Sequence, residues 1–349
     1  MKKSGKFVGL LLLATVLLFA GCQRRGPAAG DSEFGPPIEL TFATTSSIDD
    51  LITQAANKMK GLIEERSGGQ MTVNVFPASQ LGNAMAMMEM VSDGAIDLLI
   101  ESSTFLSNFG VPNAHLIALP FLVGSVEEFV VLNNSSFMQE LFEENLRVNN
   151  IRIIGSNWIR PWSTIASKSP VRTLEDWNGL RVRIPPVEFL IHGMARLGLS
   201  PTPVAYGETL MALQQGVVDA GWIRADAVYT MRWFEATDYL IKGRFNIDTL
   251  FHYFSERTFR SMTPAQQEIL IQASHDAGEW YVANSEAAVA RAAAAVQAAG
   301  MQIIHISDEE WRRWQAQVAP MAQEFEASGT RWRPGQYARV MRIMAGLES

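Results

Sequence analysis

The sequence predicts an α/β fold built from two domains. Its 349 residues exceed the usual size of a single domain, which is about 150 residues. Short apolar runs alternate with helical stretches along the chain, a pattern typical of α/β folds. One helical stretch is also too long for a single domain of this size. Hydrophobic residues make up 48% and charged residues 19%, as in globular proteins.

The expected elements begin at residue 38. Four apolar or alternating segments predict strands, at 38–43, 71–75, 96–100 and 151–154. A helix is predicted from about 48 to 66, since apolar residues recur there on one face. Ser47 is its expected N-cap, and the Gly68-Gly69 pair follows its end.

The longest predicted helix follows Thr263. Thr263 and Gln266 have the spacing of a capping box, with Pro264 at the first helical position. A helix over 264–299 would reach about 54 Å at 1.5 Å per residue. We therefore expect it to project from one domain or to run across both. A second helix is expected after Ser307, with a kink at Pro320.

The N-terminus resembles a lipoprotein signal peptide. Basic residues precede an uncharged stretch over 7–20, which is too short to span a bilayer. Residues 19–22 (FAGC) resemble a lipobox, so we expect residues 1–21 to be removed and Cys22 to be lipidated. Residues 22–37 then form a tether, and the protein is extracytoplasmic and lipid-anchored. An ordinary signal peptide with an incidental cysteine is the alternative.

Charge and cysteine content exclude several classes of protein. The formal net charge is −7, whereas nucleic-acid-binding proteins usually carry a basic excess. We therefore expect no nucleic-acid partner. Cys22 is the single cysteine, so an internal disulfide framework and a thiolate zinc cluster are excluded.

Catalytic motifs are missing from the sequence. It contains no dinucleotide or phosphate loop, no serine-hydrolase elbow and no zinc-protease motif. His275 and Glu279 lie one helical turn apart, which favours an exposed helix pair over a metal site. We predict that the protein is no enzyme and uses no cofactor or metal. A secreted hydrolase with convergent carboxylates stays open, since such pairs leave no local signature.

Separated motifs connect the chain to a known family. They are QMTVNVFPASQLG at 70–82, GAID at 94–97, LPFL at 119–122, TLEDWNGLRVRIP at 173–185, PTPV at 201–204 and ALQQGVVD at 212–219. In this order they resemble the DctP-type extracytoplasmic solute receptors of TRAP (tripartite ATP-independent periplasmic) transporters, over residues 38–315.

The resemblance implies a two-lobed periplasmic-binding-protein-like fold. A ligand would bind in a hinge cleft, and the long helix would span both lobes. The expected lobes are 38–158 plus 246–285, and 159–245 plus 286–349.

The function implied is capture of a small organic or sugar acid and its delivery to TRAP membrane subunits. The alternatives are a receptor of this family for a neutral or aromatic ligand, an ABC-type receptor, and the hydrolase.

Arg183 is the expected partner of the ligand carboxylate. Arg181 and Arg183 alternate with apolar residues, so both leave one face of a strand. The resemblance places Arg183 at the arginine of the family that binds the carboxylate. A planar guanidinium matches a carboxylate bidentately, which a lysine does not do. A structural salt bridge is the alternative for Arg183, and Arg181 is expected to be a solvated edge charge.

Three hydroxyl-bearing residues follow the predicted strand 96–100, where the family turns toward the cleft. Hydroxyl or backbone donors of Ser102, Ser103 and Thr104 are therefore expected to meet ligand oxygens. A simple helix cap is the alternative for this segment.

Two departures from the family affect the expected site. Where many members have a ligand-contacting Asn, this chain has Ile223, between Trp222 and Arg224. A second ligand-facing arginine of the family matches Trp162 without a gap, and Arg160 lies two residues earlier. The expected ligand-binding residues therefore include Arg160, Trp162, Trp222, Ile223 and Arg224. For Trp162 and Trp222, as for Trp158, a place in the core stays open.

Overall fold

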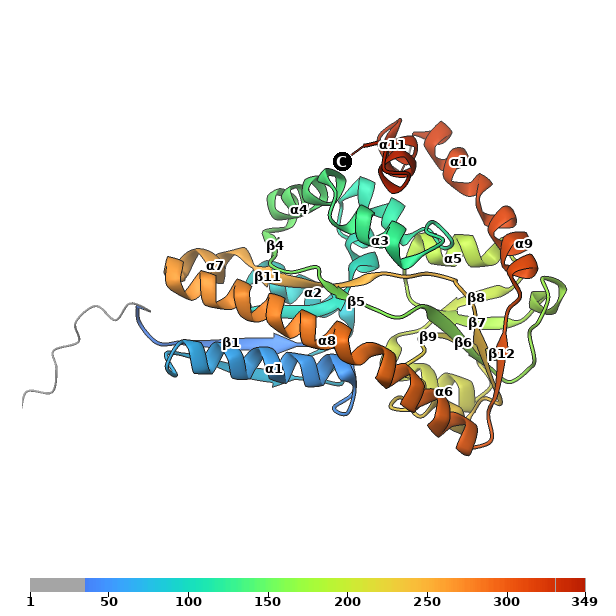
Figure 1. The fold of residues 1–349 in the computed structure, drawn as a ribbon, viewed down its shortest axis with the longest axis horizontal. Coiled ribbons are helices and arrows are strands. Elements are labelled where there is room, and N and C mark those ends of the chain that lie inside the picture. Colours follow the sequence, from blue (N-terminus) through green and yellow to red (C-terminus); the bar gives the residue numbers. More distant parts are fainter. Residues whose placement is uncertain (1–34, 330, 349) are drawn as a thin grey trace, which may run out of the picture. The chain divides into compact units, whose positions relative to one another are not determined.

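The structure is a computed structural model that describes residues 35–329 and 331–348. The expected signal peptide (1–21) and the expected lipid site, Cys22, lie outside the described residues, as does most of the expected tether. Two sheets of six strands each dominate the fold (Figure 1). The α/β class predicted from the alternation of apolar runs and helical stretches is confirmed.

The first sheet contains the early strands of the chain and one late strand. Its order is β2-β1-β3-β11-β4, and β5 also pairs with β11. The strands are β1 (Ile38–Ala43), β2 (Met71–Phe76), β3 (Leu98–Ser102), β4 (Ile151–Ile153), β5 (Trp158–Ile159) and β11 (Thr249–Ser255). β1 runs parallel to β2 and β3, whereas β11 runs antiparallel to β3. The sheet is therefore mixed.

The second sheet has the order β12-β10-β6-β9-β7-β8. Its strands are β6 (Ser163–Ser167), β7 (Arg181–Ile184), β8 (Ser200–Pro203), β9 (Ala220–Arg224), β10 (Tyr239–Lys242) and β12 (Gln302–His305). β7 lies between β8 and β9 and runs parallel to both. Residues of β7 and β9 thus emerge side by side at their carboxyl ends.

The chain passes between the sheets twice within a short distance. It leaves the first sheet after β5 and enters the second at β6, and it returns between β10 and β11. The two crossing segments are hydrogen-bonded to each other. The Arg160 amide donates to the Asp248 carbonyl at 2.9 Å, and the Ser163 amide donates to the Asn246 carbonyl at 2.9 Å.

The long helix α8 (Pro264–Ala298) connects the sheets a third time (Figure 1). Its capping box between Thr263 and Gln266 is present, as predicted. The N-terminal half buries Leu270 and Ala277 in a core shared with the first sheet. The C-terminal half buries Val296 in a core shared with the second. The expectation that this helix runs across both halves is confirmed.

Gly278 allows α8 to approach the crossing strand β5. A Cβ atom at this position would lie 2.5 Å from Cδ1 of Trp158, so a larger residue would push the helix away. Trp158 is fully buried, stacks on Tyr281 of α8 and meets the ring of His252 edge-on. Of the two readings of Trp158, the core one is correct.

The other helices pack on the two sheets or on one another. They are α1 (Leu51–Arg66), α2 (Ala84–Asp93), α3 (Val126–Asn133), α4 (Ser136–Asn149), α5 (Glu188–Ala195), α6 (Thr209–Gln214), α7 (Glu256–Ser261), α9 (Asp308–Val318), α10 (Pro320–Ser328) and α11 (Gln336–Met344). Short 3₁₀ helices occupy Ser103–Asn108, Pro112–Ala118, Glu175–Trp177, Tyr206–Glu208 and Trp233–Glu235.

Three sequence predictions of local structure need correction. Helix α1 begins at Leu51, and Asp50, not Ser47, is its N-cap, since its carboxylate accepts from the Ile52 amide at 2.9 Å. β3 covers Leu98–Ser102 and thus ends two residues later than predicted. Pro320 does not kink one helix: α9 ends at Val318, and the proline occupies the first position of α10, where its missing amide has no cost.

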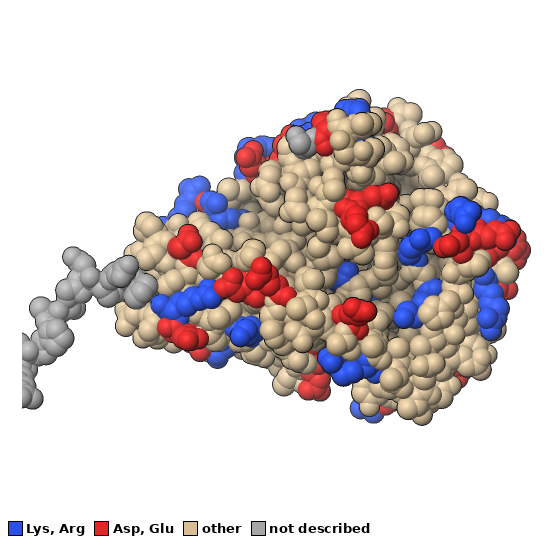
Figure 2. Space-filling view, viewed as in Figure 1, with Lys and Arg blue, Asp and Glu red and all other residues tan. Residues whose placement is uncertain are grey.

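The C-terminal helices return toward the first sheet. α11 contacts α3, and Arg339 of α11 forms an ion pair with Glu140 of α4. Charged side chains of both signs are interspersed on the face shown in Figure 2. That face offers no broad basic stripe of the kind that binds nucleic acids.

Candidate functional site

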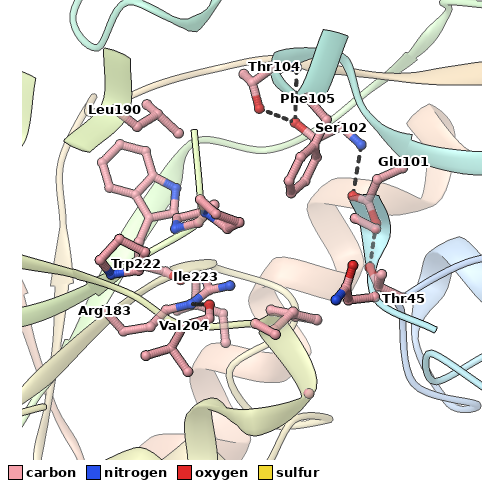
Figure 3. Close-up of a pocket in the computed structure, with 18 of the residues that line it drawn as sticks. Thr45, Glu101, Ser102, Thr104, Phe105, Arg183, Leu190, Val204, Trp222 and Ile223 are labelled. Atoms are coloured by element: carbon pink, nitrogen blue, oxygen red, sulfur yellow. Dashed lines mark hydrogen bonds between the residues drawn. The ribbon is translucent and has the colours of Figure 1, made fainter. Parts of the chain in front are cut away.

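A cavity of about 540 Å³ lies between the two sheets. The first sheet contributes residues at the end of β3, and the second contributes residues of β7 and β9 and the loop after β8. The crossing segments form its inner end. Figure 3 shows Thr45, Glu101 and Ser102 on one side, and Arg183, Trp222 and Ile223 on the other. A ligand in this cavity would contact both halves of the protein.

Arg183 is a buried cation that lines this cavity. Its side chain leaves the middle of β7 and only 3% of the residue is exposed. Nε donates to the Val204 carbonyl at 2.8 Å, and Nη1 donates to the Trp222 carbonyl at 3.1 Å. The guanidinium also lies 5.6 Å from the ring centroid of Tyr206. In the described part of the chain, no carboxylate forms an ion pair with Arg183.

Burial determines the electrostatics of Arg183. Loss of water lowers the pKa of its guanidinium to about 10, against the opposing effect of Tyr206 and Glu101. The group is therefore still charged at neutral pH. A guanidinium has five N–H donors, and the two carbonyls above accept from two of them. The alternative of a structural salt bridge is wrong for the described residues.

Arg181 behaves differently although it lies on the same strand. It is exposed, and its guanidinium forms an ion pair with Asp219, Nη2 to Oδ1 at 2.7 Å. This arrangement matches the expectation of a solvated edge charge.

Arg160 lines the cavity but is already paired. Its Nε donates to Oδ1 of Asp248 at 2.6 Å, and its Nη2 donates to Oδ2 at 2.5 Å. The same Nη2 donates to the Ser102 hydroxyl at 3.1 Å. Burial opposes the charge of Arg160, but Asp248 outweighs it and raises its pKa. Arg160 therefore links the two crossing segments to the end of β3.

Arg224 lines the cavity and is held by two carboxylates. Its Nη2 lies 2.5 Å from Oδ2 of Asp50, and its Nε lies 3.0 Å from Oδ1 of Asp226. Burial alone would lower the pKa of Arg224, but Asp226 and Asp50 raise it. Burial raises the pKa of Asp50 above its ordinary value, and Arg224 opposes that change.

The segment after β3 is only partly as predicted. Ser102 and Thr104 line the cavity, whereas Ser103, although buried, does not. The Ser102 hydroxyl caps the 3₁₀ helix Ser103–Asn108 and also donates to Asp248. The helix-cap alternative is thus correct for Ser102, and its contact with a ligand stays a prediction. The expectation for Ser103 is corrected, because this residue is buried in the first position of the 3₁₀ helix Ser103–Asn108 and is absent from the cavity lining.

The aromatic candidates separate into two groups. Trp222 and Ile223 of β9 both line the cavity. Trp162 does not: it lies in a separate hollow with Lys242 and Trp311 and packs near Val123 and Phe129. The neighbouring residue, Ser163, lines the cavity instead. The expectation for Trp162 is corrected, since successive residues of an extended segment point to opposite sides.

Sequence reasoning missed the carboxylates of the cavity. Glu101, the residue before Ser102, is buried and lines it. Its Oε2 accepts from the Thr45 hydroxyl at 2.5 Å, and its Oε1 accepts from the Ser102 amide at 2.8 Å. Asp248 lines the inner end. A charged residue directly after the apolar run 98–100, at the start of the hydroxyl-bearing segment 102–104, was the available signal for Glu101.

One group of possible metal ligands lies away from the cavity. His275, Asp276 and Glu279 come together on the outer side of α8. Asp276 forms an ion pair with Arg66, and His275 and Glu279 are exposed, as expected for a solvated helix face. Among the described helices, none is long and apolar enough to cross a membrane.

Comparisons with known proteins agree with this architecture. A family model described as bacterial extracellular solute-binding protein, family 7, matches residues 42–328. A sialic acid-binding periplasmic protein of Vibrio cholerae is 22% identical over 289 residues, covering 83% of this chain and 88% of the relative. A 2,3-diketo-L-gulonate-binding periplasmic protein of Escherichia coli is 25% identical over 242 residues, covering 69% and 73%.

Solved structures share the whole fold. A sugar acid-binding protein of Advenella mimigardefordensis, in complex with galactonate, has a TM-score of 0.83 at 17% identity and covers 90% of this chain and 99% of its own. A TRAP periplasmic solute-binding protein of Fusobacterium nucleatum with bound sn-glycerol-3-phosphate has a TM-score of 0.81 at 23% identity, covering 88% and 97%. The predicted two-lobed binding-protein fold is confirmed.

Proposed function

The chain belongs to family 7 of the bacterial extracellular solute-binding proteins, and from that premise we propose that it captures a small organic or sugar acid by its carboxylate. The bound acid is then delivered to the membrane subunits of a TRAP-type transporter. Family membership confirms the prediction that the chain is a receptor and not an enzyme. The secreted-hydrolase alternative is therefore wrong.

The observation that carries the proposal is the state of Arg183. A buried guanidinium without a carboxylate partner among the described residues is costly, and it lines a cavity that opens between two lobes. A ligand carboxylate would supply the missing counter-charge and accept hydrogen bonds from the N–H groups not used by Val204 and Trp222. The acids bound by the similar proteins named above support the same chemistry.

The remaining lining residues would surround the rest of the ligand. Ser102, Thr104 and Ser163 offer hydroxyl groups, and Trp222 and Ile223 offer apolar surface. Arg160 and Arg224 would shape the cavity while their guanidinium groups stay paired with Asp248 and with Asp50 and Asp226. Arg183 is therefore the primary anchor of the acid.

We infer that capture proceeds by closure of two lobes. One contains residues 38–158 with 246–285, and the other 159–245 with 286–349. The paired crossing segments and the change of core along α8 support this division, and the strands fall into the two sheets accordingly, except that β5 (Trp158–Ile159) extends one residue beyond the first boundary. α11 reaches back to α3 and α4, so the C-terminal segment ties the second lobe to the first.

We also propose that Cys22 carries a lipid that anchors the protein outside the cytoplasm. The sequence FAGC at 19–22 and the family's extracellular location support the proposal. The tether would then leave the lobes free to move near the membrane subunits.

A thermal-shift screen tests the function directly. Residues 38–349 are incubated with organic and sugar acids and with neutral sugars of matching size. A ligand at 100 times its dissociation constant adds about 2.7 kcal/mol of stability, which raises the melting temperature measurably. Stabilisation by at least one acid, but not by its neutral counterpart, is expected. Stabilisation by neutral sugars alone would contradict the proposed function.

A further inference from the structure

The cavity is lined by three arginines, but buried carboxylates accompany them. Arg160, Arg183 and Arg224 line it, which at first indicates a site for a dianion. Four buried carboxylates in the described residues either line the cavity or hold these arginines: Glu101, Asp248, Asp50 and Asp226. Three of these carboxylates are in ion pairs with Arg160 or Arg224, so Arg183 and Glu101 are the two groups of this set that no ion pair includes among the described residues.

We propose that this cavity selects ligands with a single negative charge and excludes dicarboxylates and phosphate dianions. The inference rests on the proposed function and narrows its substrate class to monocarboxylates.

Two of the three arginines already have carboxylate partners. Asp248 binds Arg160 through both carboxylate oxygens, at 2.6 and 2.5 Å. Arg224 is held by Asp50 and Asp226 together. A ligand anion that approached either guanidinium would also approach these carboxylates. Only Arg183 remains as an uncompensated cation of the cavity.

Glu101 lies on the opposite side of the cavity from Arg183 (Figure 3). Its carboxylate accepts hydrogen bonds from Thr45 and Ser102, and no ion pair of Glu101 is formed within the described residues. A ligand that places one carboxylate on Arg183 directs its other end toward this acid. A second anionic group there would meet an uncompensated like charge, whereas a hydroxyl group could donate to it.

The magnitude of this effect is large enough to measure. Like charges placed together in a desolvated interface cost several kcal/mol, and every 1.4 kcal/mol is a tenfold change in affinity. Weak screening in a buried cavity preserves the repulsion at physiological salt. We therefore expect a dianion to bind at least about tenfold more weakly than a monoanion of the same length.

Two matched pairs of acids test the proposal by isothermal titration at neutral pH. D-Erythronate and meso-tartrate differ only in the oxidation of the terminal carbon, as do L-galactonate and galactarate. The comparison uses the pair whose monoanion binds more tightly. In that pair the monoanion is expected to bind at least about tenfold more tightly than the dianion. sn-Glycerol-3-phosphate is expected to bind no better than the dicarboxylates.

A substitution then assigns the effect to Glu101. Glu101→Gln keeps the size and an acceptor oxygen but removes the charge, and it is expected to reduce the preference for the monoanion at least about fivefold. Glu89→Gln is the matched control: Glu89 is exposed on α2 and is not among the residues that line the cavity. This variant is expected to leave the preference unchanged.

The outcomes separate the two proposals. Equal or tighter binding of a dicarboxylate by the wild-type protein would overturn the charge selection and leave the carboxylate receptor intact. A preference that Glu101→Gln leaves unchanged would overturn the role of Glu101. Binding of neutral sugars in place of every acid in the panel would overturn the proposed function and, with it, this inference.

Discussion

Nη2 of Arg224 lies 2.5 Å from Oδ2 of Asp50, and this ion pair joins the second sheet to the N-terminus of α1 beside the first. Both residues are buried, and Asp226 binds the other edge of the same guanidinium. A second contact between the lobes runs from Nδ2 of Asn108 to the Pro186 carbonyl, at 2.7 Å. The two lobes are thus in direct contact through these polar groups.

Removal of Arg224 is predicted to destabilise the protein strongly. In Arg224→Met, Asp50 and Asp226 would remain buried without their cation, which typically costs about 3–5 kcal/mol. Urea unfolding of residues 38–349 measures the loss. Arg181→Met is the control, because Arg181 forms an exposed pair with Asp219 worth at most about 1 kcal/mol. Equal losses in the two variants would contradict the role given to Arg224.

Ligand binding is predicted to bring the lobes together. Fluorescent labels on cysteines introduced at Lys58 of α1 and Met211 of α6, in a Cys22→Ser background, report the distance between lobes. Energy transfer is expected to increase when the acid found in the screen is added, since closure shifts the population toward the compact state. A pair at Lys58 and Gln139, within one lobe, should not respond. An unchanged signal with bound ligand would argue against closure.

His252 is predicted to make the fold sensitive to acid. It is fully buried in β11, and burial lowers its pKa from 6.5 to about 3. Below pH 6.5 His252 is protonated in the unfolded chain but stays neutral in the folded protein. The free energy of unfolding therefore decreases as the pH falls. His252 alone is expected to contribute about 1.4 kcal/mol per pH unit to this slope.

The slope is measured by urea unfolding at several pH values between neutrality and pH 4. His252→Gln is expected to show a shallower slope whatever its absolute stability. His305→Gln alters an exposed histidine and is expected to keep the slope of the wild type. If the free energy of unfolding of His252→Gln depends on pH as steeply as that of the wild type, another group is responsible for the slope.

Cys22→Ser is predicted to release the protein from membranes. The change removes the thiol that a lipid would occupy, and Cys22 is the single cysteine of the chain. Fractionation of cells that express the full chain, with detection by antibody, measures the distribution. Continued membrane association of the variant would refute the lipid anchor.

Several features of the fold were predictable because they depend on local signals. The capping box at Thr263 fixes the start of α8, and the unbroken helical stretch that follows fixes its length. The alternation of Arg181 and Arg183 with apolar residues placed both on one face of β7. The family motif then indicated that Arg183, and not Arg181, lies at the cavity. Arg183 is buried and lines the cavity.

Other features depend on contacts that no local pattern reveals. Arg160 and Asp248 are 88 residues apart, and they meet because two crossing segments run side by side. The ungapped match to the family assigned the ligand-facing position to Trp162. In the structure the next residue, Ser163, lines the cavity, and the side chain of Trp162 lies in a separate hollow. Ser47 and Asp50 are both suitable N-caps by residue type, and only the packed structure separates them.

The central claim, that Arg183 binds the ligand carboxylate, is tested most directly by isothermal titration of its variants with the acid found in the screen. Loss of one partner of a desolvated charge pair costs about 2–5 kcal/mol, so Arg183→Ala should weaken binding from about 30-fold to several thousandfold. Arg183→Lys should recover only part of the affinity, because a point charge replaces a planar fork. Arg181→Ala should change affinity less than about threefold, since Arg181 pairs with Asp219 outside the cavity. If a folded Arg183→Ala variant binds the acid as tightly as the wild type, the carboxylate is held elsewhere and the account is wrong.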